Sequence, residues 1–255
     1  MKLLLSNDDG YLAAGIGALA KTLQAAGHEV FVAAPHRQRS AASRSMTLFD
    51  PLRAERVSLP AAPDVEAYAV TGTPVDCVRL ALGNLFPEPD LVLSGVNEGA
   101  NLGTDTLYSG TVAAAHEAAL LGYQAIAVSC HGHRPVHFET AARVALRAAE
   151  RLQVAPLPFG VVLNINVPDV PFEALAGVRT APLAVNQYPL RFEERTDPYG
   201  GRYFWAPSGQ KLSAHEGEDV DERWVREGWA VCTPLTYDLT DFNTMHGISV
   251  EEFNR

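Results

Sequence analysis

The sequence of 255 residues contains few cysteines. Its three, Cys77, Cys130 and Cys232, are widely spaced and form no Cys-x-x-Cys pair. An odd number cannot form a complete set of intramolecular disulfides, and a chain of this length buries a large core without them. These features exclude a disulfide-built scaffold and indicate a reducing, cytoplasmic setting. We expect Cys77 and Cys130, which lie in apolar patterns, to be core residues.

Long hydrophobic runs are absent too. No stretch of about eighteen apolar residues occurs, so we expect no membrane span. The apolar opening of residues 1–6 is too short for the hydrophobic region of a signal peptide, and Asp8 and Asp9 interrupt it at once. With 47% hydrophobic and 20% charged residues, the composition is that of an ordinary soluble globular protein.

Positive charge is scarce, since 20 Lys and Arg residues stand against 30 Asp and Glu residues and give a formal net charge of −10. Such a surface repels nucleic acid and carries no basic stripe, so we expect no nucleic-acid duplex as a partner. A small anionic substrate would need a local device, such as a metal ion, a helix N-terminus or a placed arginine. The Gly-x-Gly-x-x-Gly and Gly-x-x-x-x-Gly-Lys-[Ser/Thr] signatures of nucleotide-binding folds are also missing.

What is present is an alternation of strand and helix patterns, which predicts an α/β fold with a doubly wound, mostly parallel, Rossmann-like sheet. Strands are expected at residues 2–6, 29–34, 65–70, 90–94, 125–129 and 161–167, and helices at 16–23, 73–85, 111–121 and 137–152. Beyond residue 168 a β-hairpin is predicted from 189–195 and 202–206, and one more strand at 230–235. We therefore predict a single domain, 1–255, with a core at 1–168, a hairpin-containing extension at 169–235 and a tail at 236–255.

Three polar loops follow predicted strands, at residues 7–10, 37–47 and 95–110. In open α/β sheets ligands collect at the carboxyl edge of the strands, so Asp8, Asp9, Ser40 and Asn97 are expected within reach of one another. Taken alone, Asp8-Asp9-Gly10 is better interpreted as a turn and a helix cap. Two crowded carboxylates repel, however, and a divalent cation would offset that repulsion.

The other two loops also allow two interpretations each. Residues 37–47 form either a solvated surface loop or a source of a hydroxyl ligand from Ser40, with arginines available to anions. Residues 95–110 form either a flexible connection or, because long loops in compact domains are uncommon unless functional or disordered, a binding loop. Its end, Ser109-Gly110-Thr111, directly precedes an apolar helix whose unpaired N–H groups suit phosphate.

The sequence resembles the SurE family of stationary-phase survival nucleotidases over nearly its whole length. The resemblance is carried by Ser6-Asn7-Asp8-Asp9-Gly10, Ala34-Pro35 with Ser40, Thr71-Gly72-Thr73-Pro74, Asp90-Leu91-Val92-Leu93-Ser94-Gly95-Val96-Asn97, Asn101-Leu102-Gly103 and Tyr108-Ser109-Gly110-Thr111-Val112, with weaker matches at residues 163–168 and 233–235.

The resemblance implies a divalent-metal-dependent phosphomonoesterase that hydrolyses nucleoside 5′- and 3′-monophosphates and, in some members, short polyphosphate. It implies metal ligation by Asp8, Asp9, Ser40 and Asn97. On that basis we predict catalysis by Asp8 and Asp9, and substrate phosphate binding by Asn7, Ala41, Asn101, Ser109, Gly110 and Thr111. It also implies a homodimer or homotetramer held by the tail and the hairpin. Ala41 stands where many members have glycine; because the position is expected to offer a backbone N–H, alanine can serve there if its φ is negative.

The donor chemistry agrees with the resemblance. Four oxygen donors, two of them neutral, suit Mg²⁺ or Mn²⁺, with one ion per subunit, whereas zinc would favour His or Cys. His131, His133 and His137 are interleaved with Gly and Pro and are expected in an exposed loop. Two alternatives are a non-catalytic nucleotide-binding protein and a receiver-type signalling domain. The latter needs an acceptor aspartate at a middle strand end, where this chain has Ser94-Gly95.

Overall fold

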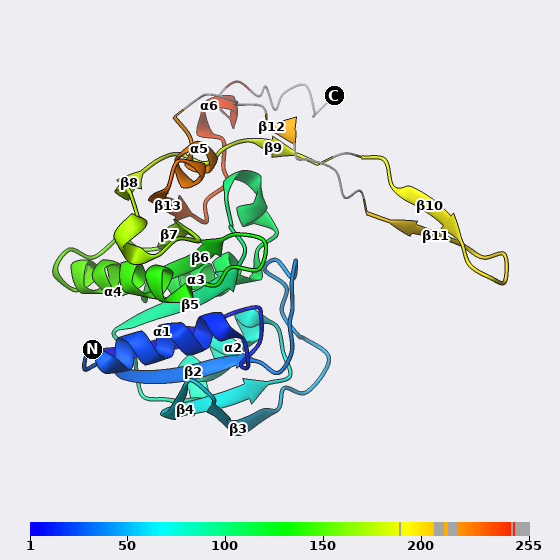
Figure 1. Cartoon of the computed structure of the whole chain (residues 1–255). Coiled ribbons are helices and arrows are strands. Elements are labelled where there is room, and N and C mark those ends of the chain that lie inside the picture. The colour runs from blue at the N-terminus through cyan, green and yellow to red at the C-terminus, as the bar shows by residue number, and fades with distance from the viewer. Residues whose placement is uncertain (189, 207–211, 214–218, 246, 248–255) are drawn as a thin grey trace.

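The computed structural model describes residues 1–188, 190–206, 212–213, 219–245 and 247. A nine-stranded sheet runs through the centre in the order β3-β4-β2-β1-β5-β6-β7-β13-β8, with helices on both faces (Figure 1). Its strands are β1 (Lys2–Ser6), β2 (Glu29–Pro35), β3 (Ala54–Leu59), β4 (Ala62–Val70), β5 (Leu91–Glu98), β6 (Gln124–His131), β7 (Val161–Pro168), β8 (Gly177–Thr180) and β13 (Trp229–Thr236). The longer helices are α1 (Ala14–Ala25), α2 (Pro74–Leu80), α3 (Gly110–Leu120) and α4 (Phe138–Val154).

The two faces of the sheet bury separate hydrophobic clusters. Leu3 and Leu5 of β1 pack on the side of α1 and α4, while Leu4 between them packs on the side of α2 and α3. All three are at most 1% exposed, which is why the central strand is a continuous apolar run rather than an alternating one. The pairs β2–β1, β1–β5, β5–β6 and β6–β7 are parallel. The predicted α/β fold class is confirmed.

Several elements differ from the sequence prediction. Strand β5 continues to Glu98 after an irregularity, because Asn97 and Glu98 still pair with β6, so the predicted loop at 95–110 is shorter. Within it, Gly103–Leu107 forms a 3-10 turn. The predicted helix 73–85 is α2 followed by a π-helical turn, η1 (Ala81–Leu85). Strand β3 and the short helix α5 (Asp221–Arg226) were not predicted.

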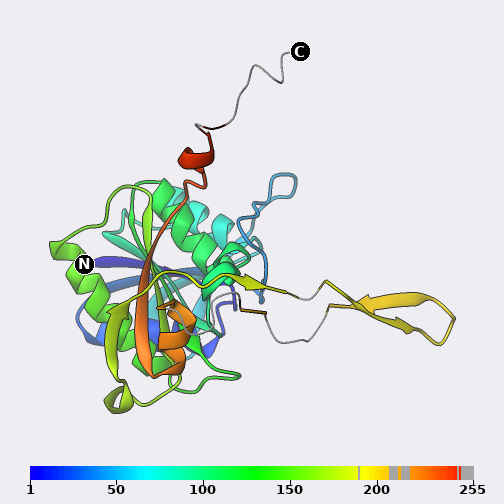
Figure 2. The same cartoon turned by 90° about the horizontal axis from the view of Figure 1, so that it is seen from above.

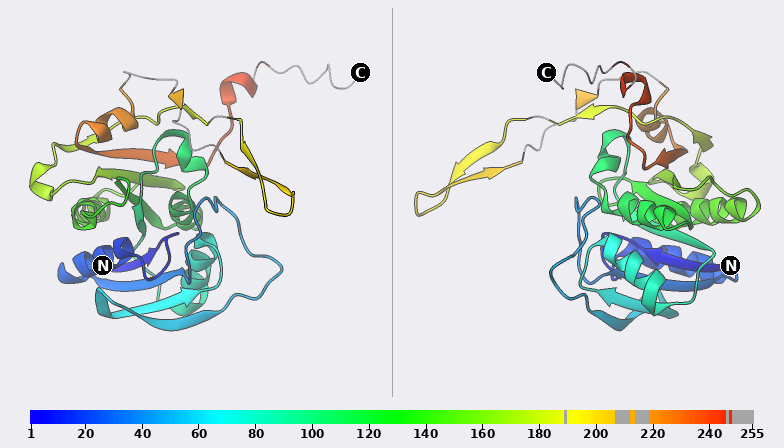
Figure 3. Two further views of the ribbon diagram at one scale, coloured as in Figure 1. Left: turned by 45° about the vertical axis from the view of Figure 1, so that its right-hand side comes forward. Right: turned by 180° about the vertical axis from the view of Figure 1, so that it is seen from behind.

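The extension beyond β7 adds strands to the sheet edge and sends out an arm. Short strands β9 (Asn186–Gln187) and β12 (Leu212–Ser213) pair with each other, and between them lies the hairpin of β10 (Glu193–Thr196) and β11 (Arg202–Trp205). Figure 2 and the right-hand view of Figure 3 show this hairpin projecting well away from the body. The predicted hairpin is confirmed, although Pro189 lies outside the described residues, as do residue 246 and residues 248–255 of the predicted tail. Among the described residues, none of the helices is both long and apolar enough to cross a membrane.

A buried carboxylate, Asp76, ties the loop before β3 to the start of α2. It accepts hydrogen bonds from the Thr73 N–H (2.8 Å) and from both the N–H (3.0 Å) and the hydroxyl (2.6 Å) of Thr47. Its own N–H donates to Thr73 Oγ1, which completes a capping box. Burial alone would raise the pKa of Asp76, but these hydrogen bonds lower it below the ordinary value of 3.8.

We expect Asp76→Asn to lower the free energy of unfolding by about 1–3 kcal/mol at pH 7, the usual loss for a charged hydrogen-bonded group. Because the folded-state pKa of Asp76 lies below its unfolded value, its stabilisation is fully present above about pH 4 and disappears as the pH falls through the folded value. Urea denaturation of both proteins at pH 7 and pH 3 measures the difference. An equal loss at the two pH values would contradict a role for the charge.

Candidate active site at the carboxyl edge of the sheet

The turn after β1 presents two adjacent carboxylates. Asn7 is fully buried beneath it, and both ends of its amide bind Gly10: Nδ2 donates to the Gly10 carbonyl (2.9 Å) and Oδ1 accepts from the Gly10 N–H (3.2 Å). Gly10 has a φ of +97°, a conformation that favours glycine. The turn is therefore fixed from inside, and its side chains Asp8 and Asp9 are held at the carboxyl edge of the sheet.

Asp8 is 6% exposed and faces the start of helix α3. Thr111 Oγ1 donates to Asp8 Oδ1, and the backbone N–H groups of Gly110 and Thr111 bind the same carboxylate. Burial nevertheless raises the pKa of Asp8 above its ordinary value, against the lowering effect of these hydrogen bonds. A buried carboxylate with a raised pKa is stabilised in its charged form by a nearby cation.

Asp9 is less buried and lies on the side of β5. Its Oδ2 accepts from the Glu98 N–H (2.9 Å), and its Oδ1 lies 3.4 Å from Gln38 Nε2. Burial raises the pKa of Asp9 to about 6, and the negative charges of Asp8 and Glu98 add to this against the hydrogen bond from the Glu98 N–H. Both carboxylates of the turn therefore resist ionisation.

The two neutral oxygen donors reach the same place from other elements. Asn97 Nδ2 donates to the Gly99 carbonyl (2.8 Å), which leaves Oδ1 directed at Thr111 Oγ1, 3.3 Å away. Thr111 thus brings the oxygens of Asn97 and Asp8 together. Ser40 is carried by a loop that is fastened on both sides of it, by Arg39 N–H to the Asp8 carbonyl (2.7 Å) and by Ser43 N–H to the Tyr108 carbonyl (3.1 Å).

These residues line one cleft of about 190 Å³. Its lining consists of Asp8, Asp9, Ser40, Ala41, Asn97, Glu98, Asn101, Asp105, Tyr108, Ser109 and Tyr188. All four predicted metal ligands lie in it, with three of the six predicted phosphate-binding residues. Four of the lining residues are carboxylates and none is Lys or Arg, so the described cleft is strongly acidic. Two carboxylates and two neutral oxygen donors at such a place fit a hard divalent cation.

The geometry agrees with the comparisons to known proteins. The sequence profile of the family described as Survival protein SurE matches residues 3–189. The chain belongs to the SurE family. It is 46% identical over 251 residues to the 5′-nucleotidase SurE of Synechococcus elongatus, covering 96% of this chain and 97% of that protein. It is 44% identical over 250 residues to the 5′-nucleotidase SurE of Aeromonas hydrophila, covering 97% of each.

The fold is shared as well. The crystal structure of the SurE protein from Aquifex aeolicus matches with a TM-score of 0.83 at 35% sequence identity, covering 99% of this chain and 100% of that chain. The resemblance predicted from the sequence motifs is therefore confirmed.

One SurE motif that looked secondary in the sequence supports the site. Asn164 and Asn166, on β7, donate their amides to the Asn101 carbonyl at 2.9 and 3.0 Å, and Asn166 Oδ1 accepts from the Asn101 N–H. Asn101 Nδ2 in turn donates to Ser129 Oγ. These asparagines hold the loop residue Asn101 against the sheet. In the sequence, they could have been recognised as two polar residues in an otherwise apolar predicted strand.

The first N–H groups of α3 were predicted to bind phosphate, but in the structure they contact Asp8. The N–H groups of Gly110 and Thr111 and the Thr111 hydroxyl meet Asp8, and the Val112 N–H donates to the Ser109 side chain (3.1 Å). Gly110 and Thr111 are therefore supports of Asp8 in this structure, and their predicted contact with substrate phosphate stays a prediction. The arginines predicted for anions are absent from the described lining of the cleft, and Arg39 donates to the Thr71 carbonyl (3.1 Å).

The condition of a negative φ at Ala41 is not met. Its φ is +56°, in the left-handed region where a side chain is unfavourable, which explains why glycine suits this position in the SurE family.

We expect Ala41→Gly to raise the free energy of unfolding by about 0.5–1 kcal/mol, since removing Cβ relieves about 1–2 kcal/mol of strain but adds backbone entropy to the unfolded chain. Thermal unfolding measures it, with Ala61→Gly at an exposed turn of ordinary φ as the control. A larger loss for Ala41→Gly than for the control would contradict the strain.

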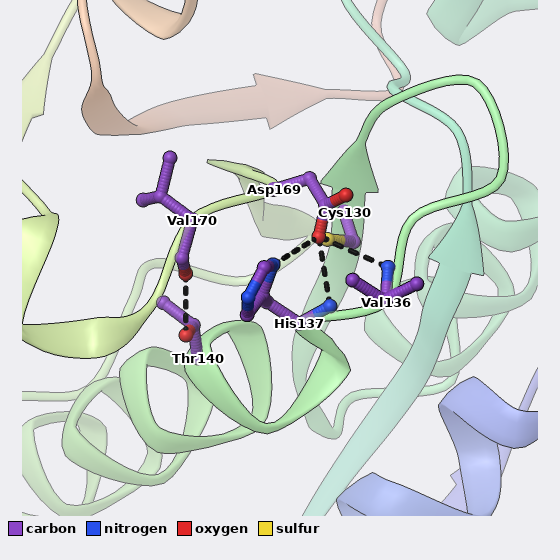
Figure 4. A network of polar contacts seen from close by, with 6 residues as sticks. All are labelled: Cys130, Val136, His137, Thr140, Asp169 and Val170. Carbon is purple, nitrogen blue, oxygen red and sulfur yellow. Dashed lines mark hydrogen bonds and ion pairs between the residues drawn. The ribbon is translucent and has the colours of Figure 1, made fainter.

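The prediction of an exposed loop holds for His133 alone, because His131 ends strand β6 and is partly buried, and His137 is partly buried at the N-cap of α4. Asp169 Oδ1 lies 2.9 Å from His137 Nδ1 and accepts hydrogen bonds from the backbone N–H groups of Val136 (3.0 Å) and His137 (2.7 Å), so this carboxylate fixes the two residues that lead into α4 (Figure 4). The nearby Cys130 is fully buried, as predicted, and so is Cys77. In the described part of the chain no group of three or more His, Cys, Asp or Glu residues could hold a metal ion.

Proposed function

We propose that this SurE-family protein is a divalent-metal-dependent phosphomonoesterase acting on nucleoside 5′- and 3′-monophosphates, with short polyphosphate as a secondary substrate. The observation that carries the proposal is the convergence of Asp8, Asp9, Ser40 and Asn97 on one acidic cleft. Two relatives that are named as 5′-nucleotidases support the reaction class. A receiver-type domain is disfavoured because it needs an acceptor aspartate at a middle strand end, where β5 carries Ser94 and Gly95.

In this proposal Asp8, Asp9, Ser40 and Asn97 hold one Mg²⁺ or Mn²⁺ ion. A bound ion would neutralise negative charge on the phosphoryl group and lower the pKa of a coordinated water molecule. Asp8 is fixed by Thr111 and the start of α3, so it serves as the rigid ligand. Asp9 is the more accessible carboxylate and orients the attacking water.

The remaining parts of the cleft position the substrate. Asn101, clamped by β7, and Ser109, at the N-cap of α3, face the cleft and are assigned to the phosphate oxygens, together with the backbone N–H of Ala41. Asn7, Gly110 and Thr111 are assigned to shaping the turn and fixing Asp8. Hydrogen-bond donors that are already fixed stabilise the transition state more than flexible donors do, because they need not reorganise during the reaction.

The proposal is tested by measuring phosphate release from 5′-AMP, 3′-AMP and tripolyphosphate after chelation and after return of Mg²⁺, Mn²⁺ or Zn²⁺. We expect activity on both nucleotides that is lost with chelator and restored by Mg²⁺ or Mn²⁺. Activity that survives exhaustive chelation, or binding of nucleotide without any phosphate release, would overturn it.

We also propose one catalytic domain, with residues 169–235 as an extension and 236–255 as a tail, assembled as a homodimer or homotetramer in the cytoplasm. The free cysteines suit that compartment. The arm supports assembly, since every residue of β10 and β11 is exposed, including Phe204 and Trp205 at 54% and 58%. A lone two-stranded hairpin is marginally stable in water, and a partner surface would stabilise it.

We expect the double variant Phe204→Ser, Trp205→Ser to shift the mass in light scattering toward the 27.5 kDa of one chain. The wild-type protein is expected at two or four times that mass. Truncation after Asp238 tests the tail in the same assay and leaves β13 intact. An unchanged mass in both variants would contradict assembly through the arm and the tail.

A further inference from the structure

Residues 99–109, the cleft loop, connect β5 to α3 and close one side of the cleft. The loop carries Asn101 and Ser109, the two side chains assigned to the phosphate oxygens, and between them it forms the 3-10 turn Gly103–Leu107. A turn this short has few hydrogen bonds of its own, and their geometry is poorer than in an α-helix. Its position therefore depends on what holds it from outside.

The turn is held by the extension, which is distant in the sequence. The Gly103 N–H donates to Asp221 Oδ2 (2.8 Å) across a separation of 118 residues, and Thr104 Oγ1 donates to the Asn186 carbonyl (2.8 Å). Two successive residues of the cleft loop are thus bound by the part of the chain that also carries the arm.

Asp221, the first residue of α5, is the centre of this attachment. It is completely buried and accepts three backbone N–H groups, those of Gly103 at Oδ2 and of Ala184 and Glu222 at Oδ1, each at 2.8 Å. Burial raises the pKa of Asp221 above its ordinary value against these hydrogen bonds, and the charge of Glu222 adds to the increase. Burying a carboxylate costs free energy, which its hydrogen bonds offset. Because its two oxygens bind different segments, Asp221 ties the cleft loop to the extension.

The loop and the extension approach too closely for a side chain at Gly103. The φ of Gly103 is +54°, and a Cβ atom there would lie 2.6 Å from the Ala184 carbonyl oxygen and 2.7 Å from Asn186 Nδ2. Two residues further on, the Asp105 carboxylate accepts a hydrogen bond from the Tyr188 hydroxyl. The extension therefore fixes the turn at more than one point.

The turn passes its position on to the residues assigned to phosphate. The Ser109 N–H donates to the Asp105 carbonyl (3.1 Å), and Asn101 precedes Gly103 by only two residues. The carboxylates proposed to bind the metal ion, and Asn97 with them, lie on the turn after β1 and on β5 instead. A loosened turn therefore weakens phosphate binding more than metal binding.

We propose that Asp221 is a positioning residue for the reaction, because it holds the cleft loop where Asn101 and Ser109 meet the phosphate oxygens. This inference rests on the proposed phosphatase function. It makes the extension part of the catalytic unit, since a residue more than a hundred positions from the cleft loop in the sequence sets the geometry of that loop.

The test is Asp221→Asn, which keeps the size of the side chain but places an NH₂ group opposite one of the three N–H groups. We expect kcat/KM for 5′-AMP to fall about 10–100-fold, the usual result of a small misplacement in a catalytic arrangement. The inhibition constant of inorganic phosphate is expected to rise about tenfold, because a hydrogen bond to a charged group contributes roughly that much to binding. The Kd for Mn²⁺, measured by calorimetry, is expected to stay unchanged.

Asp219→Asn is the matched control. Its carboxylate is exposed and binds Arg179 (3.7 Å) and the Trp224 indole, so this variant removes a carboxylate from the extension without touching the cleft loop. We expect it to lower the thermal stability and to leave both kcat/KM and the phosphate inhibition constant at their wild-type values.

A milder variant gives a readout if Asp221→Asn does not fold. Thr104→Val removes only the hydrogen bond to the Asn186 carbonyl and keeps the shape of the side chain. We expect it to raise the phosphate inhibition constant about threefold, in line with a neutral hydrogen bond, again with unchanged Mn²⁺ binding. Hydrogen exchange of residues 99–109 is expected to become faster in this variant while that of β1 and β5 stays the same.

The outcomes separate the positioning role from the reaction itself. If the wild-type protein releases no phosphate from 5′-AMP, the phosphatase function fails. If it is active, but Asp221→Asn and Thr104→Val either keep wild-type kinetics or weaken phosphate and Mn²⁺ binding equally, the positioning role is overturned while the phosphatase function stands.

Discussion

We expect Asp8→Asn to release phosphate from 5′-AMP at least about a hundredfold more slowly than the wild-type protein. Changing only a supporting partner of a metal ligand costs about 10–100-fold in affinity or activity, and Asp8 is proposed as a ligand itself. The substitution keeps the shape of the side chain but removes its charge. It also places an amide NH₂ or a neutral oxygen opposite the N–H groups of Gly110 and Thr111 and the Thr111 hydroxyl.

The measurement is the initial rate at saturating Mn²⁺, together with Mn²⁺ binding by calorimetry. The matched control is Asp64→Asn, which removes the same charge from an exposed position near the amino end of β4, away from the carboxyl edge that carries the site. We expect the control to keep the wild-type rate. A wild-type rate for Asp8→Asn, with Mn²⁺ bound normally, would remove Asp8 from the proposed site.

The second large effect is expected for Gly110→Ala, which adds a single methyl group. A Cβ atom at Gly110 would lie 2.8 Å from Asp8 Cβ and 2.9 Å from Asp8 Oδ2, closer than real Cβ contacts come. Because β1 and α3 are both held by their backbones, Asp8 must shift. A misplacement of about 1 Å in a catalytic arrangement can cost about a hundredfold in rate, so we expect a loss of about 10–100-fold.

The helix itself should not suffer, since alanine is a better helix former than glycine by about 1 kcal/mol. Gly83→Ala is the matched control, because a Cβ there meets nothing within 4 Å. Phosphate release and thermal unfolding of the two variants are measured side by side. Rates within twofold of each other would show that the close approach of Gly110 to Asp8 has no part in activity.

The strands that form the floor of the site were predictable because burial on both faces makes them continuous apolar runs. Their carboxyl ends meet at one edge, which allowed residues from distant loops, such as Asp8 and Asn97, to be grouped in advance. Strand β3 escaped prediction because it is an edge strand with charged, half-exposed residues, and only its pairing with β4 makes it a strand.

Within the site, the orientation of the backbone, the helix and the side chains could not be predicted from the sequence. The left-handed backbone of Ala41 is set by its loop, not by its residue type. The use of the α3 N–H groups for Asp8 depends on how closely that helix approaches β1. Tyr188 reaches the cleft from the extension, and no local pattern around it indicates a neighbour such as Asp105.

The pairing of β9 with β12 allows the length of the arm to change during evolution without disturbing the rest of the fold. Since Gln187 pairs with Leu212 and Asn186 with Ser213, the chain leaves and re-enters the body at neighbouring points. Closing a longer excursion between such points costs little, because each doubling of a loop adds only about 0.6 kcal/mol. Insertions and deletions in the arm can therefore accumulate between homologues without shifting the register of the nine-stranded sheet. Quaternary structure can diversify by this route while the chemistry of the cleft is inherited unchanged.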